Sequence, residues 1–216
     1  MEHRSTRTEP AKLEPSYATD LLRRQEALQA EAHTVLADLD LMALLARAGH
    51  PVLVGSAALG LMTWRDIDVE VYCNRWSADH AFESMRPLAS HARVKKLRYS
   101  NESGPLRSVG LPDGYYWGVR YYTEAGDEWK IDVWFIPADD APRAERDPLR
   151  TIPARLTPEI SLAILWIKDV WHRLPAYRHR VLSVDIYDAV LEQGVRTPAE
   201  FDAYLVARGK PARELQ

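Results

Sequence analysis

The sequence predicts an α+β fold in which a mixed β-sheet is flanked by helices and is followed by a small C-terminal helical unit. Two observations support this prediction. Short apolar runs that suit buried strands lie between residues 52 and 136, separated by turn residues and by segments with helical periodicity. From Thr157 onwards the pattern is helical, with Thr-Pro helix starts at Thr157 and Thr197.

Changes in composition divide the chain into four predicted regions. Residues 1–15 are charged and twice interrupted by proline, which predicts a flexible N-terminus. Residues 16–137 form the predicted core. Residues 138–156 contain three prolines and no apolar periodicity, which predicts a linker. Residues 157–216 make up the predicted helical unit.

The first predicted helix covers residues 17–48, where leucine and valine recur with helical spacing. The acidic stretch Asp38–Asp40 can interrupt this helix, and Gly49 is its predicted C-cap. A further helix, with Ser77 as its N-cap and Phe82 pointing inward, is expected over residues 78–92. We expect both helices to act as scaffold against the sheet.

The predicted strands differ in how polar they are. The strand over residues 93–99 carries lysine and arginine, which favours a solvated edge strand, with contact to phosphate or to an acidic acceptor as the alternative. The other runs are mostly apolar and suit buried strands. They are residues 52–54, a strand from about residue 67, and residues 115–123 and 129–136, which form a predicted hairpin.

Composition excludes several classes of function. The chain has 216 residues, 46% hydrophobic and 27% charged, which is typical of a soluble globular protein. Its net charge of −3 and pI near 6.2 provide no global positive field for nucleic acid. Cys73 is the one cysteine, so an internal disulfide and a cysteine-rich zinc site are excluded.

No stretch of the sequence favours a membrane. The first twenty residues lack the apolar run of a signal peptide. The longest uncharged run, Pro51–Trp64, is too short to span a bilayer. We therefore expect a cytoplasmic location and no membrane partner.

Acidic residues interrupt the apolar strands at two places. Asp66 and Asp68 lie one residue apart on a predicted strand, so both point to one face. Two carboxylates beside an apolar core repel each other and lose hydration, and a divalent cation would relieve both costs. Asp132 interrupts the apolar run over residues 129–136, and a hydrogen-bonded core aspartate is the alternative there. Gly55 and Ser56, at the start of a short helix, offer backbone N–H groups, a hydroxyl and a positive dipole end to a phosphate.

The order and spacing of Gly55-Ser56, the Asp66/Asp68 pair and Asp132 resemble the DNA polymerase β-like nucleotidyltransferase superfamily over about residues 52–136. The resemblance implies Mg²⁺-dependent transfer of a nucleoside monophosphate from an NTP, with ATP as a candidate, to an acceptor. It implies that Asp66 and Asp68 hold two Mg²⁺ ions. Asp132 would complete the ion at the acceptor oxygen and is the candidate general base. Gly55 and Ser56 would bind the β and γ phosphates.

The C-terminal helices carry a second resemblance, to abortive-infection-type and related small nucleotidyltransferases. Lys168 precedes Asp185 and Asp188 on the next predicted helix. In the family pattern such a lysine faces the triphosphate and an aspartate on the following helix supports the site. Val184 stands where that pattern has a basic residue. Solvated surface charges are the alternative for Lys168 and for the two aspartates.

The acceptor stays open at the level of sequence. A mildly acidic protein of this size favours a small hydroxylated molecule such as an antibiotic. A protein or tRNA, as in toxin–antitoxin nucleotidyltransferases, is the first alternative, and a catalytically silent nucleotide-binding module is the second. A P-loop is excluded because Leu61 and Met62 stand where lysine and serine or threonine are needed. Mutual repulsion of the three carboxylates further predicts that the metal-free fold is destabilised at this point.

Overall fold

The computed structural model describes residues 13–140 and 152–213. The chain divides into two compact units. We call residues 25–154 the sheet unit, and residues 1–24 together with 155–216 the helix unit. Most of the predicted flexible N-terminus (1–15) and most of the predicted linker (138–156) lie outside the described residues. The predicted domain boundaries therefore stay predictions.

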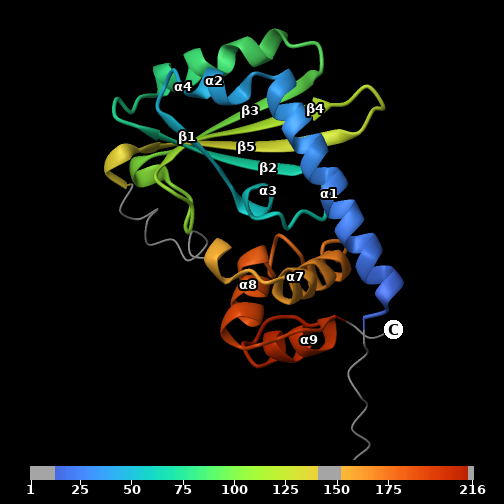
Figure 1. Cartoon of the computed structure of the whole chain (residues 1–216). Helices are drawn as coiled ribbons and strands as arrows, with labels where there is room; N and C mark the ends of the chain where they lie inside the picture. Colours follow the sequence, from blue (N-terminus) through green and yellow to red (C-terminus); the bar gives the residue numbers. More distant parts are fainter. Residues whose placement is uncertain (1–12, 141–151, 214–216) are drawn as a thin grey trace, which may run out of the picture. The chain divides into compact units, whose positions relative to one another are not determined.

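The sheet unit contains one mixed sheet of five strands, which confirms the predicted fold class. The strand order is β1-β2-β5-β4-β3 (Figure 1). β2 and β5 are parallel and the other neighbouring pairs are antiparallel. The strand rich in lysine and arginine, β3, lies at the edge of the sheet. The strands are β1 (His50–Val54), β2 (Asp66–Cys73), β3 (Val94–Glu102), β4 (Gly114–Tyr122) and β5 (Glu128–Pro137).

One face of the sheet packs into the hydrophobic core. Ile67 and Val69 on β2 and Ile131 and Val133 on β5 are fully buried. The helices α2 and α4 run along one side of the sheet (Figure 1), and residues of both belong to this core. Because side chains alternate along a strand, the residues at even positions of β2 and β5 point to the opposite face.

The first long helix breaks where the acidic stretch was expected to interrupt it. Asp40 takes a left-handed backbone conformation, φ 46°, between α1 (Pro15–Asp38) and α2 (Leu41–Leu45). The prediction that Gly49 caps this helix is wrong, because Ala46 is the C-cap. Gly49 instead permits a close approach, since a Cβ there would lie 2.3 Å from the carbonyl oxygen of Tyr72.

The helix predicted over residues 78–92 is shorter than expected. α4 (Ala78–Met85) gives way to the 3₁₀ turn η1 (Arg86–Ser90), where Pro87 removes a backbone donor. Phe82 does not point inward as predicted, because 46% of it is exposed. Its ring instead packs edge-on against Trp117. The remaining short elements are α3 (Gly55–Leu59), η2 (Gly104–Leu106), η3 (Ala138–Asp140) and η4 (Pro153–Arg155).

The helix unit is built from capped helices. α7 (Pro158–Trp171) begins at Thr157, whose side chain accepts a hydrogen bond from the Ile160 amide, and α9 (Pro198–Val206) begins with a capping box at Thr197. α8 (Ser183–Glu192) follows α7 after the segment 172–182. Arg178, with φ 68°, breaks the helical path there.

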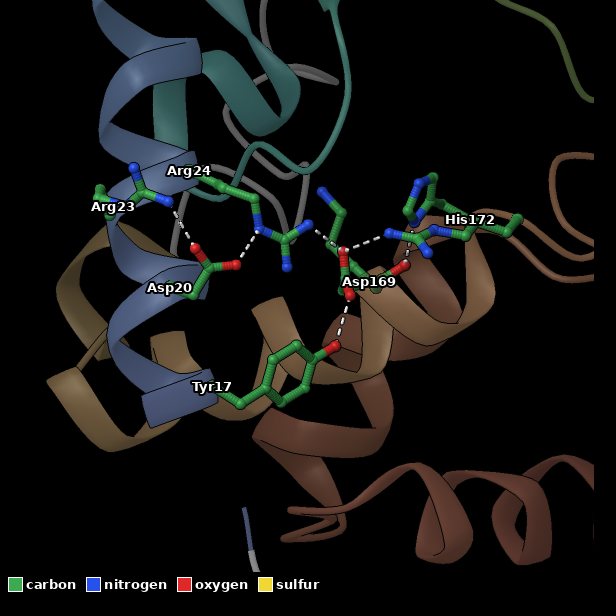
Figure 2. A network of polar contacts seen from close by, with 8 residues as sticks. Tyr17, Asp20, Arg23, Arg24, Asp169 and His172 are labelled. Atoms are coloured by element: carbon green, nitrogen blue, oxygen red, sulfur yellow. Dashed lines mark hydrogen bonds and ion pairs between the residues drawn. The ribbon is translucent and has the colours of Figure 1, made fainter. Parts of the chain in front are cut away.

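A polar network joins the start of α1 to α7 within the helix unit (Figure 2). The Tyr17 hydroxyl donates to Asp169 Oδ2 over 2.5 Å, and Arg24 Nη1 donates to Asp169 Oδ1 over 2.9 Å. Arg173 lies 3.6 Å from the same carboxylate. Burial alone would raise the pKa of Asp169, but the hydrogen bonds from Tyr17 and Arg24 and the arginine charges lower it overall. This carboxylate is fully compensated by side chains of the chain itself.

Within residues 13–140 and 152–213, no helix combines the length with the apolar character that crossing a bilayer requires. The cytoplasmic location expected from the sequence stays a prediction.

Candidate active site

Three aspartates meet on the polar face of the sheet. Asp66 and Asp68 come from β2, and Asp132 from β5, which pairs in parallel with β2 so that Asp68 lies opposite Asp132. One carboxylate oxygen from each of the three lies within 4.8 Å of the others. The three residues singled out from the sequence therefore converge, because strand alternation and strand pairing place them on one face.

Two of these carboxylates each accept a hydrogen bond from a neutral side chain on one of their oxygens. Trp64 Nε1 donates to Asp66 Oδ2 over 3.0 Å, and the Tyr116 hydroxyl donates to Asp132 Oδ1 over 2.9 Å. The other oxygen of each faces Lys130. Its ammonium Nζ lies 3.2 Å from Asp66 Oδ1 and 2.5 Å from Asp132 Oδ2.

The cluster changes the acidity of its neighbours. Burial alone would lower the pKa of Lys130, but the charges of Asp66 and Asp132 outweigh it, and the pKa is raised. Burial, reinforced by the charge and hydrogen bond of Asp132, raises the pKa of Tyr116 to about 12. Lys130 therefore stays an ammonium, and Tyr116 stays a hydrogen-bond donor at neutral pH.

Sequence reasoning missed Lys130, Trp64 and Tyr116. The signal for Lys130 was present, because it stands two residues before Asp132 on a strand and so shares its face. Lys130 supplies an internal counter-ion that the expectation of a destabilised metal-free fold did not include, and that expectation stays a prediction. With the lysine included, the formal charge of the cluster is −2 rather than −3.

Two glycines make room for the cluster. Gly118 lies opposite Asp132 on β4, and a Cβ there would lie 2.7 Å from the Tyr116 hydroxyl oxygen. Gly55 has φ +65°, and a Cβ there would lie 2.6 Å from Asp68 Oδ2. Any larger residue at either position would displace a polar group of the cluster.

The phosphate roles expected for Gly55 and Ser56 stay predictions. Gly55 begins α3, directly beside Asp68, and Ser56 is 8% exposed. The helix has only five residues, so its macrodipole is small, and the dipole part of the expectation contributes little. The backbone N–H groups of its first turn are the groups that a phosphate could use.

The C-terminal candidates belong to the helix unit. The alternative that Lys168 is a solvated lysine is wrong, because it is fully buried, with its Nζ 3.5 Å from the Tyr187 hydroxyl. Asp185 accepts a hydrogen bond from the Leu182 amide at the start of α8 and pairs with Lys210 over 2.6 Å, whereas Asp188 is exposed. A nucleotide-binding role for Lys168 stays a prediction.

The donor set of the sheet unit suits a hard divalent cation. Mg²⁺ prefers carboxylate oxygens and is bound by few protein ligands, and the cluster offers three carboxylates with an excess of negative charge. Hydrogen bonds from Trp64 and Tyr116 would orient two of them, as is usual around metal sites. The residues present therefore fit the ion that the resemblance implies.

Comparison with known proteins gives structural neighbours alone, because no family model and no curated protein matches the chain. The neighbours are polymerase β-like nucleotidyltransferases, the class that the sequence resembles. A cytoplasmic RNA terminal U-transferase is 16% identical with a TM-score of 0.43, and the match covers 69% of this chain and 46% of that chain. CdnC of E. coli MS115-1, in its complex with HORMA-deltaN, is 16% identical with a TM-score of 0.41 over 92% of this chain and 67% of that chain.

An aminoglycoside 6-adenyltransferase from Bacillus subtilis is 17% identical with a TM-score of 0.30, over 50% of this chain and 36% of that chain. The chain thus spans less than half the length of the U-transferase.

Proposed function

We propose that the chain is a Mg²⁺-dependent nucleotidyltransferase that moves a nucleoside monophosphate from an NTP to a hydroxyl group. The observation that carries this proposal is the convergence of Asp66, Asp68 and Asp132 from two parallel strands. Together with the ammonium of Lys130, the three carboxylates keep a formal charge of −2, which a divalent cation would neutralise. Their presence also counts against a catalytically silent nucleotide-binding module.

Asp66 and Asp68 would hold two Mg²⁺ ions, and Asp132 would complete the site of one of them. When bound, such ions lower the pKa of the acceptor hydroxyl and neutralise charge on the phosphates. The acceptor oxygen attacks the α-phosphorus, the bond to the pyrophosphate oxygen breaks, and pyrophosphate leaves. The Asp132 carboxylate is also the candidate general base that would accept the hydroxyl proton.

The nucleotide would bind beside the aspartates. Gly55 and Ser56 would contact the β and γ phosphates through backbone N–H groups and the serine hydroxyl. The position of Gly55 beside Asp68 supports this arrangement, since a metal-bound triphosphate has to reach both the ions and these donors.

For the acceptor we favour a small hydroxylated molecule such as an antibiotic. The support is the net charge of −3, which supplies no general attraction for a polyanion.

An anionic acceptor such as tRNA is the second candidate, and one observation favours it. Lys96 and Arg98 on β3 are exposed, and pairing across β4 places Arg98 in the same row of the sheet as Asp132. A strand of basic side chains beside the cluster would suit a phosphate backbone.

The experiment is incubation of the chain with each α-labelled NTP, Mg²⁺ and panels of small hydroxylated molecules and of tRNA, followed by measurement of pyrophosphate release and of labelled product. We expect one acceptor class to be labelled, with the activity lost in Asp66→Asn. The exposed Asp139 provides a matched control, and Asp139→Asn should keep full activity. An activity that survives Asp66→Asn, or that needs no divalent metal, would overturn the proposal.

A further inference from the structure

We propose that Lys130 is a resident counter-ion of the acidic cluster: its ammonium occupies a position that a divalent cation takes, and it has to leave when metal binds. The inference rests on the proposed function, because it takes the cluster to be a metal site. It adds that the ammonium of Lys130 and the metal ion compete for the same carboxylate oxygens, and that this competition sets the metal concentration that the chain needs.

The position of the ammonium is the first support. Lys130 Nζ lies between Asp66 Oδ1 and Asp132 Oδ2, at 3.2 and 2.5 Å. Trp64 and Tyr116 donate to the other oxygen of each carboxylate. The ammonium therefore contacts the two oxygens that do not accept these hydrogen bonds. The oxygens that a metal would use on these two aspartates are therefore the oxygens that the ammonium now holds.

Charge and space are the second support. Mg²⁺ binds oxygen at about 2.0–2.1 Å, and Nζ lies 2.5 Å from Asp132 Oδ2, so an ion on that oxygen would lie within about 4.6 Å of the present Nζ position. A divalent ion and an ammonium at that separation repel strongly, and the side chains of Asp66, Asp132 and Lys130 are only 12%, 15% and 27% exposed, so water screens them incompletely. The two cations cannot share these oxygens.

The chemistry of lysine is the third support. An ammonium is a compact point charge on a flexible four-carbon stem, and it can swing away by rotation about single bonds. At 27% exposure the side chain already reaches solvent. Trp64 and Tyr116 need not move, because their oxygens are not the ones exchanged. The cluster can therefore exchange an internal cation for an external one without rearranging its strands.

Mn²⁺ titration of the chain, followed by the electron paramagnetic resonance signal of the unbound ion, tests the competition. We expect Lys130→Met to bind Mn²⁺ about tenfold more tightly than the wild type, since the ion no longer displaces an ammonium. Lys95→Met removes the same charge from an exposed position on β3 and should change the affinity less than twofold. In EDTA, Lys130→Met should melt below the wild type, and saturating Mn²⁺ should remove the difference.

The outcomes separate this inference from the proposed function. If the wild type binds Mn²⁺ and Asp132→Asn does not, the metal site stands, and equal or weaker binding by Lys130→Met then overturns the role of Lys130. If the wild type shows no saturable binding, the metal site fails and the inference fails with it. Should Lys130→Met not fold, Lys130→Gln takes its place. Lys130→Arg, which keeps the charge, should bind no more tightly than the wild type.

Discussion

Two aspartates of this chain have nearly the same local surroundings and differ in their charge balance. Asp169 in the helix unit and Asp132 in the sheet unit have side chains that are 6% and 15% exposed. Each accepts a hydrogen bond from a tyrosine hydroxyl, Tyr17 or Tyr116, and each forms an ion pair. By burial and hydrogen bonding alone, neither would be singled out as functional.

The cations around them make the difference. Asp169 has two guanidinium groups within 4.0 Å, those of Arg24 and Arg173. Arg24 also pairs with Asp20, and these four groups together carry no net negative charge. Asp132 shares the ammonium of Lys130 with Asp66 and lies opposite Asp68, so its surroundings carry excess negative charge. A carboxylate compensated by fixed arginines is structural, whereas a cluster left with net negative charge is prepared for a mobile cation.

Substitution of the two aspartates should separate these roles and gives the largest expected effects. Asp132→Asn should reduce nucleotidyl transfer on the order of 10³-fold, because a metal ligand is lost. Its free energy of unfolding should change by less than about 1 kcal/mol, because Lys130 keeps Asp66 as a partner and the repulsion between the carboxylates falls. Asp169→Asn should lower the free energy of unfolding by about 1–3 kcal/mol, because a buried carboxylate loses its charge-assisted hydrogen bonds from Tyr17 and Arg24. Chemical denaturation and product formation measure the two quantities.

The distinction between a functional Asp132 and a structural Asp169 is wrong if Asp132→Asn unfolds far more easily than the wild type, since Asp132 would then be a core carboxylate. The distinction is also wrong if Asp169→Asn leaves the free energy of unfolding unchanged.

Alternation could be predicted from the sequence, and it places Asp66 and Asp68 on one face of their strand. The parallel pairing of β2 with β5, which brings Asp132 beside them, comes from the structure. The same pattern placed β3 at the sheet edge and a break in the first helix near Asp40. These features depend on local periodicity and on single residues with strong backbone preferences.

What could not be predicted depends on long-range packing. Trp64 donates to Asp66 from a loop, and no hydrophobic periodicity in the sequence predicts this contact. The pairing of Asp169 with Arg24 joins positions 145 residues apart. Gly49 looked like a helix cap because the close backbone of Tyr72 is invisible in the sequence.

Gly55→Ala should give the next largest effect, by disturbing the cluster through space. A Cβ at a φ of +65° costs about 1–2 kcal/mol, and here it also meets Asp68 Oδ2. We expect transfer to fall on the order of tenfold or more. Gly126→Ala is a matched control, since Gly126 has φ +87° with no atom within 4 Å of an added Cβ. Gly126→Ala should lower the free energy of unfolding by a similar amount and leave the activity per folded molecule unchanged. Equal losses of activity in the two variants would rule out a specific role of the contact with Asp68.

Removing the tyrosine hydroxyl should have a smaller effect. Tyr116→Phe deletes one hydrogen bond to Asp132, worth about 1 kcal/mol, so transfer should fall about fivefold. Because the pKa of Tyr116 is raised to about 12, the effect should be constant between pH 6 and 9. Gly118→Ala should reproduce the loss, since its Cβ would displace the hydroxyl. If Tyr116→Phe keeps full activity at limiting Mg²⁺, this hydrogen bond does not orient Asp132.

The smallest expected effect is the change with pH of the stability difference between the wild type and Asp169→Asn. The pKa of Asp169 is lowered in the folded chain, so its contribution is complete above the ordinary aspartate pKa and is lost as the pH falls through the folded value. Denaturation midpoints of the wild type and Asp169→Asn should therefore differ most near pH 7 and converge below about pH 4. A gap that stays constant down to pH 3 would mean that charge is not what Asp169 contributes.

The most direct test of the central claim is a crystal structure of the chain with Mn²⁺ and a non-hydrolysable NTP, with the ions located by anomalous scattering. The account predicts anomalous peaks ligated by Asp66, Asp68 and Asp132, with the phosphates against Gly55 and Ser56 and with Lys130 Nζ withdrawn from Asp132. Anomalous peaks elsewhere, with Lys130 still seated between Asp66 and Asp132 at saturating Mn²⁺, would contradict it.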